Sequence, residues 1–461
     1  MRTALRLGAL LAIALMASAA APRGAGAALR VPYTTFTLPN GLQVILHEDH
    51  ALPIVTVNTW YHVGSGDEQP GRTGFAHLFE HIMFMGSQHV PTGEFDQLLE
   101  AAGADNNGST TEDRTNYYED GPANALPLML WLDSDRMGFL IPEMTAEKVD
   151  LQRGVVKNER RQSYENQPYG LASENILKRL FPATHSYSWP VIGSMADLSA
   201  ASLDDVKGFF RSYYTPNNAV LVIAGDIQPA EARRLVERDF GGIPRGPEVK
   251  RVTPAPFALA GDVPATLEDR VQVPRVYDAW HTTREFAPDD AALGAAAQVL
   301  AGGKASRLYR RLVYELQIAS NVYAYQNGRR MDGDFRVVAT ARPGHGLDEL
   351  QTVIVEEVAR LAQDGPTRRE LERVVNGVEA EALDGMQQVG GFGGIADQLN
   401  RYAYFTGTPD YFEQDLDRYR RLTTADVQRV AKQYLADAHK VVLSVVPQGK
   451  TDLAVGEGRK P

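Results

Sequence analysis

The order of apolar and polar residues predicts a β-sheet in the first half of the chain. Residues 34–38 and 42–46 have strand composition and flank an Asn-Gly pair, which is typical of a β-hairpin. Residues 54–61 are rich in β-branched and aromatic side chains, which favours a third strand. Residues 218–226 are almost wholly apolar and end in a turn, as expected of a buried strand.

Helices are expected between these strands. Residues 74–85 contain no proline and no glycine after Gly74, which favours a helix. A second helix is expected at 94–102, ending at a glycine, and a third at 125–137. Thr145 is a suitable N-cap for a fourth helix that extends to about residue 164.

The second half repeats this plan in outline. Strands are expected at 270–273 and 276–280, and an alanine-rich segment at 289–300 takes the place of the first predicted helix. The chain closes with a helix near 425–435 and a strand at 440–446. A glycine- and proline-rich stretch separates the halves. The expected division is residues 1–27 a signal peptide, 31–243 a first domain, 244–266 a linker, 267–450 a second domain and 451–461 a tail.

Length, charge and composition narrow the class of protein. The chain has 461 residues, too many for one ordinary core, so two domains are expected. The formal net charge of −11 argues against a nucleic-acid partner, which would need a basic face. The absence of cysteine excludes disulfides, a cysteine nucleophile and thiolate metal sites.

The first residues have the pattern of a targeting segment. Arg2 and Arg6 precede an apolar run at 7–21, which is too short for a stable membrane anchor. Small residues spaced for cleavage follow at 17–19 and 25–27. We therefore expect an exported protein, periplasmic or secreted; the alternative is an uncleaved anchor.

The predicted helix at 74–85 carries the strongest chemical signal. His77 and His81 lie one turn apart on the same face, so both imidazoles can reach one ion, and Glu80 borders that face. The pattern H-x-x-E-H is that of an inverted zinc-peptidase motif, in which the glutamate takes a proton from a water activated by the metal. The alternative is a pair of packed or solvated histidines without a ligand.

A zinc site of this kind needs a third protein ligand, typically a carboxylate. Several acids lie on or beside the predicted helix at 145–164, namely Glu147, Asp150, Glu159 and Glu165. Spacing alone does not select one of them, since each is equally compatible with a solvated helix face.

Four segments together resemble the pitrilysin family of zinc metallopeptidases (family M16), which includes insulin-degrading enzyme and mitochondrial processing peptidase. They are H-L-F-E-H at 77–81, F-M-G-S at 84–87, residues 103–110, and V-V-K-N-E at 155–159. The resemblance implies an α+β fold of two similar domains, each a mainly antiparallel sheet packed with helices (the M16, LuxS-like metallohydrolase fold). It also implies that only one domain keeps the metal.

The resemblance also assigns roles to residues. It implies one Zn²⁺ held by His77, His81 and Glu159, with Glu80 as catalytic base. Gln152 stands where the family often has a supporting second-shell glutamate, and it lacks that charge. Asn107, Gly108, Ser109 and Thr110 match an edge strand that pairs with the backbone of an extended peptide substrate; the alternative is an ordinary polar turn.

One family feature is missing from the second half. Members that complete their own chamber carry an arginine and, seven residues later, a tyrosine that stabilise the oxyanion; here Val313 and Ser320 occupy those positions. Arg307 and Tyr314 have the spacing but are out of register. The resemblance therefore implies a zinc-dependent endopeptidase that is the metal-bearing subunit of a heterodimer with a homologous M16 chain. The alternatives are a self-sufficient homodimer and a non-catalytic structural or binding subunit.

Residues 390–394 are four glycines around Phe392. No Gly-Lys-Ser/Thr follows, so the segment is not a phosphate-binding loop. We expect a hinge between two helices; the alternative is a loop that touches substrate.

Overall fold

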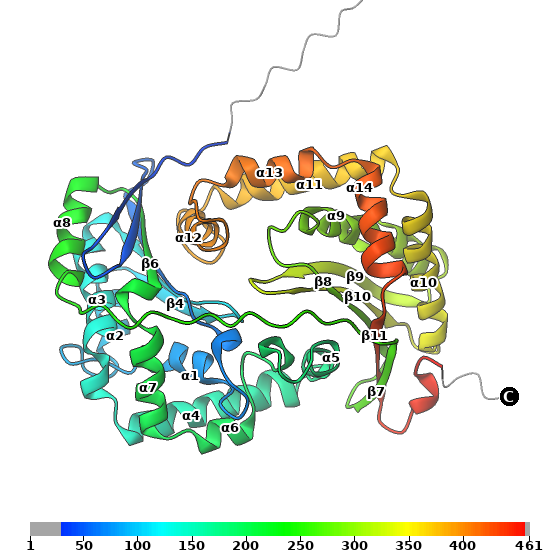
Figure 1. Ribbon diagram of the computed structural model, residues 1–461, viewed down its shortest axis with the longest axis horizontal. Helices are drawn as coiled ribbons and strands as arrows, with labels where there is room; N and C mark the ends of the chain where they lie inside the picture. The colour runs from blue at the N-terminus through cyan, green and yellow to red at the C-terminus, as the bar shows by residue number, and fades with distance from the viewer. Residues whose placement is uncertain (1–28, 457–461) are drawn as a thin grey trace, which may run out of the picture.

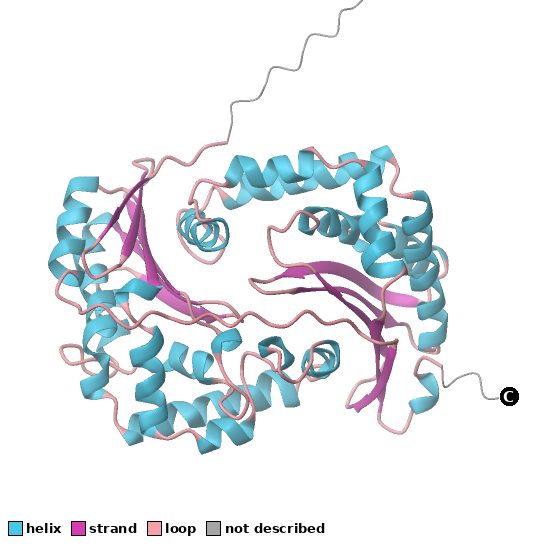
Figure 2. Ribbon diagram, in the orientation of Figure 1, coloured by secondary structure: helices cyan, strands magenta, loops and turns pink. Residues whose placement is uncertain are grey.

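A computed structural model describes residues 29–456 and shows two β-sheets, each covered by helices (Figures 1 and 2). The predicted signal peptide at 1–27 lies outside the described residues. No helix within 29–456 has the length and apolar character needed to cross a bilayer. The first sheet has the strand order β1-β2-β6-β3-β5-β4 and the second β7-β11-β8-β10-β9. The strands are β1 (Thr34–Thr37), β2 (Gln43–Glu48), β3 (Ile54–Tyr61), β4 (Asp105–Thr110), β5 (Thr115–Pro122), β6 (Ala219–Gly225), β7 (Val263–Asp269), β8 (Arg275–Thr282), β9 (Ala319–Gly328), β10 (Gly333–Ala341) and β11 (Lys440–Pro447).

The two sheets share one pairing scheme, which confirms the fold of two similar domains. In the first, β2 is parallel to β6, and the pairs β6–β3, β3–β5 and β5–β4 are antiparallel. In the second, β7 is parallel to β11, and the pairs β11–β8, β8–β10 and β10–β9 are antiparallel. β4 and β9 are therefore equivalent edge strands.

The helices also correspond between the halves. An 18-residue helix follows the last hairpin strand in each half, and a helix capped by a threonine side chain comes next. The helices are α1 (Phe75–Ile82), α2 (Glu94–Ala101), α3 (Leu126–Glu143), α4 (Ala146–Arg160), α5 (Ala172–Leu180), α6 (Met195–Ala200), α7 (Leu203–Tyr213), α8 (Pro229–Phe240), α9 (Asp290–Ala301), α10 (Leu347–Asp364), α11 (Arg368–Gly385), α12 (Ile395–Thr406), α13 (Phe412–Arg420) and α14 (Thr424–Val430).

Three expectations from the sequence are wrong in detail. Residues 270–273 form no strand; the strand lies earlier, at β7, where it pairs with β11. α3 continues past its expected end to Glu143, but it is kinked at Phe139 (φ −131°, ψ 17°), close to that expected end. The start of the predicted tail also packs on the second half, since Ala454 is buried and the N–H of Val455 donates to Ser444 Oγ.

Each half has its own apolar core, and the halves contact each other at several places. The helix α5 of the first half packs against β8, β10 and β11 of the second sheet in a shared apolar cluster. α12 of the second half lies against the first sheet, where the Asn400 amide donates to the backbone carbonyl of Asn58 (3.0 Å) (Figure 1). The turn between β9 and β10 reaches the first half, where Arg329 pairs with Glu112 (2.9 Å). These contacts hold the edge of the first sheet against the second half.

Candidate metal centre

The helix α1 separates its apolar and polar residues cleanly. Leu78, Phe79 and Ile82 are buried in the first core, so the opposite face carries the polar residues. The N-cap position is Gly74, in the left-handed region (φ 88°), and offers no capping side chain. The buried carboxylate of Glu68 takes that role, because it accepts from the N–H groups of Gly74 (3.0 Å) and Ala76 (2.8 Å).

Two histidines on α1 meet one glutamate from α4. His77 Nε2 lies 3.6 Å from Glu159 Oε1, and His81 Nε2 lies 3.3 Å from Glu159 Oε2. Ligands about 2.0–2.1 Å from a tetrahedral zinc ion are separated by about 3.3–3.4 Å, so both distances fit one ion. Two imidazoles and a carboxylate are also a common catalytic zinc set. Within 29–456 this is the only group of three such side chains close enough to share an ion.

The pKa values of His77 and Glu159 favour the protonation states that bind a cation. Burial lowers the pKa of His77, which favours the neutral imidazole that a metal requires. The hydrogen bond with His81 lowers the pKa of Glu159, so its carboxylate is ionised. The Nδ1 atom of His77 is buried without a partner in the described part of the chain, so packing rather than a second hydrogen bond orients this ring.

Glu80 lies beside these ligands and faces the edge strand. Thr110 Oγ1 donates to Glu80 Oε2 (2.6 Å), which leaves Oε1 for another partner. A Cβ atom built on Gly108 would lie 3.1 Å from Glu80 Cγ, so a larger residue there would crowd the carboxylate. The predicted base and two residues of the predicted substrate strand are thus brought together.

The strand β4 is an edge of the first sheet among the described strands. The Thr111 N–H donates to the Arg114 carbonyl (2.9 Å) at its end, and the alternation of antiparallel pairs then directs the backbone groups of Gly108 and Thr110 away from β5. Asn107 Oδ1 accepts from the Gly108 N–H (2.8 Å), and the Arg114 guanidinium donates to the carbonyl and hydroxyl of Ser109.

The second half holds the turn that follows β4. Asp113 is buried and accepts from the Arg330 N–H (2.8 Å) and the Tyr187 hydroxyl (2.5 Å). This turn is continuous with Thr110, so the β9–β10 turn supports the residue that contacts Glu80. Nothing in the sequence singles out Asp113 or Arg330, because the contact joins segments more than two hundred residues apart.

The other residues considered from the sequence make their contacts outside the group of His77, His81 and Glu159. The Gln152 amide donates to Met85 Sδ (2.6 Å), and in the described chain it makes no hydrogen bond to His77, His81 or Glu159. Val313 packs against the second core, and the Ser320 hydroxyl donates to the Thr340 carbonyl (3.2 Å). The out-of-register pair is also distant from the site, since Arg307 bonds to Glu370 (2.8 Å) and Tyr314 is 77% exposed.

The glycine-rich stretch at 390–394 joins α11 to α12, as expected of a hinge between helices. Its Phe392 ring lies 5.0 Å from the ring of Tyr118 on β5, in an edge-to-face arrangement. The loop thus approaches the face of the first sheet that carries Tyr118, and α1 covers the opposite face, where the Tyr117 hydroxyl donates to the Phe79 carbonyl.

Comparison with known proteins gives matches over both halves. Residues 43–188 match the profile described as Insulinase (Peptidase family M16), and residues 200–378 match Peptidase M16 inactive domain. The zinc protease PqqE of Helicobacter pylori is 28% identical over 90% of this chain and 93% of its own. The mitochondrial-processing peptidase subunit beta of Blastocladiella emersonii is 25% identical over 96% of this chain and 95% of its own.

A solved structure with the same fold also resembles this chain. The crystal structure of a protease from Helicobacter pylori has a TM-score of 0.82 at 26% identity and covers 91% of this chain and 100% of that chain. The two profiles together span most of the sequence, and the same fold recurs in the structure. The chain belongs to peptidase family M16.

Proposed function

We propose that this protein is a zinc-dependent endopeptidase that cleaves extended or unfolded polypeptides. The convergence of His77, His81 and Glu159 next to Glu80 carries the proposal. The names of relatives such as the zinc protease PqqE support the choice of metal. Zn²⁺ bound by these three side chains would lower the pKa of a water molecule and polarise a peptide carbonyl.

The residues of the chain itself supply the rest of the mechanism. Oε1 of Glu80 takes the proton of the attacking water, while the hydroxyl of Thr110 holds Oε2 in place. The carboxylate then returns this proton to the leaving amine. The Gly108 carbonyl and the outward backbone groups of Thr110 pair with an extended substrate, which selects for unfolded chain rather than for particular side chains; the Gly108 N–H is already bonded to Asn107 Oδ1.

We further propose that the catalytic unit is a heterodimer with a homologous M16 chain. Val313 and Ser320 leave this chain without the arginine and tyrosine that such enzymes use at the oxyanion. Loss of one oxyanion donor costs about 10²–10³ in rate. A relative named as a subunit, the mitochondrial-processing peptidase beta chain, supports a two-chain assembly. The basic start and short apolar run of residues 1–27 support export of the chain.

The decisive variant is Glu80→Gln, assayed on an unfolded polypeptide with and without a metal-free homologue. We expect it to retain zinc and to lose about 10²–10⁴ in kcat, because the amide cannot accept the proton. Unchanged turnover would remove Glu80 from the role of base. Full activity of the isolated wild-type chain would refute the heterodimer, and a purified chain without zinc would favour a non-catalytic subunit.

A further inference from the structure

Arg160 is a buried charged residue that the proposed mechanism does not use. It follows Glu159 on α4 and is 7% exposed. Successive residues of a helix point about 100° apart, so the two side chains leave α4 in different directions. A buried guanidinium is costly unless the surrounding groups pair with it. The partners of Arg160 therefore show which parts of the molecule it holds together.

The guanidinium joins three segments of the first half. Its Nη2 atom donates to Glu174 Oε2 on α5 (2.8 Å), and its Nη1 atom donates to the backbone carbonyl of Gly193 (2.9 Å). Glu174 is itself buried and also accepts from Lys178 (2.6 Å). The planar fork of one arginine thus connects α4 to α5 and to the loop before α6.

The loop at Gly193 holds the start of α1. A Cβ atom built on Gly193 would lie 2.4 Å from the Cα atom of Gly74, the N-cap residue of α1, so the two backbones are in direct contact. The Ser194 N–H donates to Thr73 Oγ1 (3.0 Å), and the Thr73 hydroxyl donates to Asp197 Oδ2 (2.6 Å). This loop therefore fixes the place where α1 begins.

The metal ligands follow closely on both helices. His77 stands three residues after Gly74, and Glu159 stands one residue before Arg160. The contacts from Arg160 through Gly193 to Gly74 thus connect the two helices that carry the ligands, and α4 lies against both α1 and α6 (Figure 1). Zinc ligands must lie within about 0.2 Å of their ideal distances, so the separation of these helices matters for the metal.

The second half has matching helices and lacks this arginine. Three residues on α9 repeat the i, i+3, i+4 spacing of H-x-x-E-H, namely Gly294, Ala297 and Gln298. On α11, Glu381 stands at the same distance after the N-cap as Glu159 does on α4. The next residue is Ala382, at the position of Arg160. The arginine thus accompanies the half that has the ligands.

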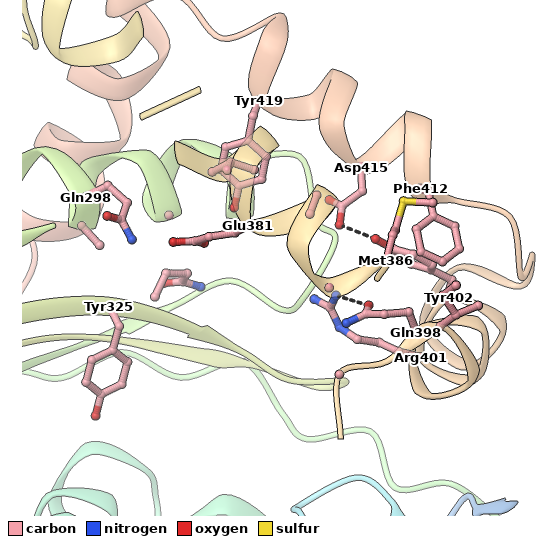
Figure 3. A pocket seen from close by; sticks show the side chains of 18 of the residues that line it. Gln298, Tyr325, Glu381, Met386, Gln398, Arg401, Tyr402, Phe412, Asp415 and Tyr419 are labelled. Atoms are coloured by element: carbon pink, nitrogen blue, oxygen red, sulfur yellow. Dashed lines mark hydrogen bonds between the residues drawn. The ribbon is translucent and has the colours of Figure 1, made fainter. Parts of the chain in front are cut away.

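The corresponding place in the second half is a cavity of about 410 Å³, which we call the second site. It is bounded by α9 and α11 together with β9, α12 and α13, and Gln298, Glu381 and Tyr419 are among the residues that line it (Figure 3). A Cβ atom built on Gly294 would lie 2.8 Å from the hydroxyl oxygen of Tyr419. The half without the metal motif therefore has a cavity beside the two helices, whereas the half with the motif has a buried arginine that connects them.

We propose that Arg160 is a positioning residue for the metal centre, because it fixes α4 to the start of α1 and so sets the gap between Glu159 and the two histidines before the metal binds. The gap of 3.3–3.6 Å is the one that a tetrahedral zinc ion needs. Ligands that are already held in place lose less freedom on binding, so the arginine raises the affinity for zinc. This inference rests on the proposed zinc centre and says how the chain prepares it.

The test is the affinity of the full chain for Zn²⁺, measured by competition with a chelator of known affinity. Arg160→Lys keeps the charge and can still pair with Glu174, but an ammonium lacks the fixed fork that also reaches Gly193. We expect zinc binding to weaken about 10- to 100-fold, as when other groups that orient a metal ligand are lost. With Co²⁺ instead of Zn²⁺, the visible absorption of the tetrahedral ion should weaken, because Glu159 is displaced.

Arg336→Lys is the matched control. Arg336 is a buried arginine of the second half (4% exposed) that bonds to Asp334 and Ser173. This variant should lower the urea midpoint of unfolding as Arg160→Lys does and should bind zinc as the wild-type chain does. Thr73→Val breaks the connection at its other end and keeps Arg160, so it should weaken zinc binding several-fold. It decides the question alone if Arg160→Lys does not fold.

The outcomes separate this inference from the proposed function. Zinc affinity at the wild-type level in Arg160→Lys and Thr73→Val would overturn the inference and leave the zinc centre in place. An equal loss of zinc affinity in Arg336→Lys would also overturn it, since the loss would then follow from stability in general. A wild-type chain that binds no zinc would overturn the proposed function, and this inference with it.

Discussion

The two halves of this protein place different chemistry on the same scaffold. In the first half, the face of α1 over the edge strand β4 carries two imidazoles and the Glu80 carboxylate, and Glu159 of α4 lies close enough to the imidazoles to share an ion with them. In the second half, the matching face of α9 over β9 carries Gly294, Ala297 and Gln298. The hydroxyl of Tyr419 lies beside Gly294, in the space that a larger side chain would need. The comparison shows that the sheet and its helices set positions, whereas a handful of side chains sets function.

Residues of the second half also stabilise part of the first half. Its β9–β10 turn holds Asp113 and Glu112, and these residues end the strand that places Thr110 on Glu80. A half without a metal-binding motif therefore contributes structure to the half that has one.

The largest expected effect comes from removing the proposed third metal ligand, Glu159, from the first half. Glu159→Gln should reduce bound zinc from about one ion per chain to near none and lower activity by more than about 10³, because two imidazoles alone leave the ion under-coordinated. Metal analysis after dialysis measures this. Glu147→Gln, an exposed acid in the first turn of the same helix, is the control and should keep its zinc. A Glu159→Gln protein with full zinc would contradict the assignment of the third ligand.

The next effect tests the edge strand. Gly108→Val should lower kcat/KM about 10- to 100-fold, since the new Cβ crowds Glu80 Cγ at 3.1 Å and disturbs the proton acceptor. The zinc content should be unchanged. Gly377→Ala on α11 faces open space and should leave activity as it is. Wild-type kinetics for Gly108→Val would separate this strand from catalysis.

A smaller effect is expected where the second half supports the first. Asp113→Asn should destabilise the fold by about 1–3 kcal/mol, because the amide has one acceptor oxygen and cannot accept from both the Arg330 backbone N–H and the Tyr187 hydroxyl. It should also lower kcat several-fold with KM little changed, since the disturbance reaches Glu80 through Thr110. Urea unfolding and steady-state kinetics measure the two effects. A stability loss with unchanged kcat would show that the contact is purely structural.

The smallest effect should fall on stability alone. Arg307→Gln removes the partner of Glu370 and should cost about 1 kcal/mol at pH 7 without a change in kcat. Burial disfavours the charged form of Glu370, yet the hydrogen bonds from Arg307 lower its pKa to about 2. This stabilisation is therefore present above the ordinary glutamate pKa and is lost as the pH falls toward 2. Urea unfolding at several pH values checks this, and a loss of kcat would restore Arg307 as a catalytic candidate.

Local features of the fold were predictable because neighbouring residues decide them. The hairpin at β1–β2, the N-cap at Thr145 and the spacing of His77 and His81 depend on turn chemistry, capping and the 3.6-residue period. The strand predicted at 270–273 is wrong because distant residues, rather than neighbouring ones, decide the position of this strand. Pairing with the distant strand β11 decides where β7 lies, and the local composition does not reveal it.

The sequence by itself determined that two imidazoles and a carboxylate would share one face of a helix, because those residues are close in the chain. Only the tertiary structure decided that Glu159 reaches them, that Thr110 holds Glu80, and that Tyr419 fills the second site. Each of those contacts joins segments far apart in sequence, and the packing of whole helices and sheets brings them together.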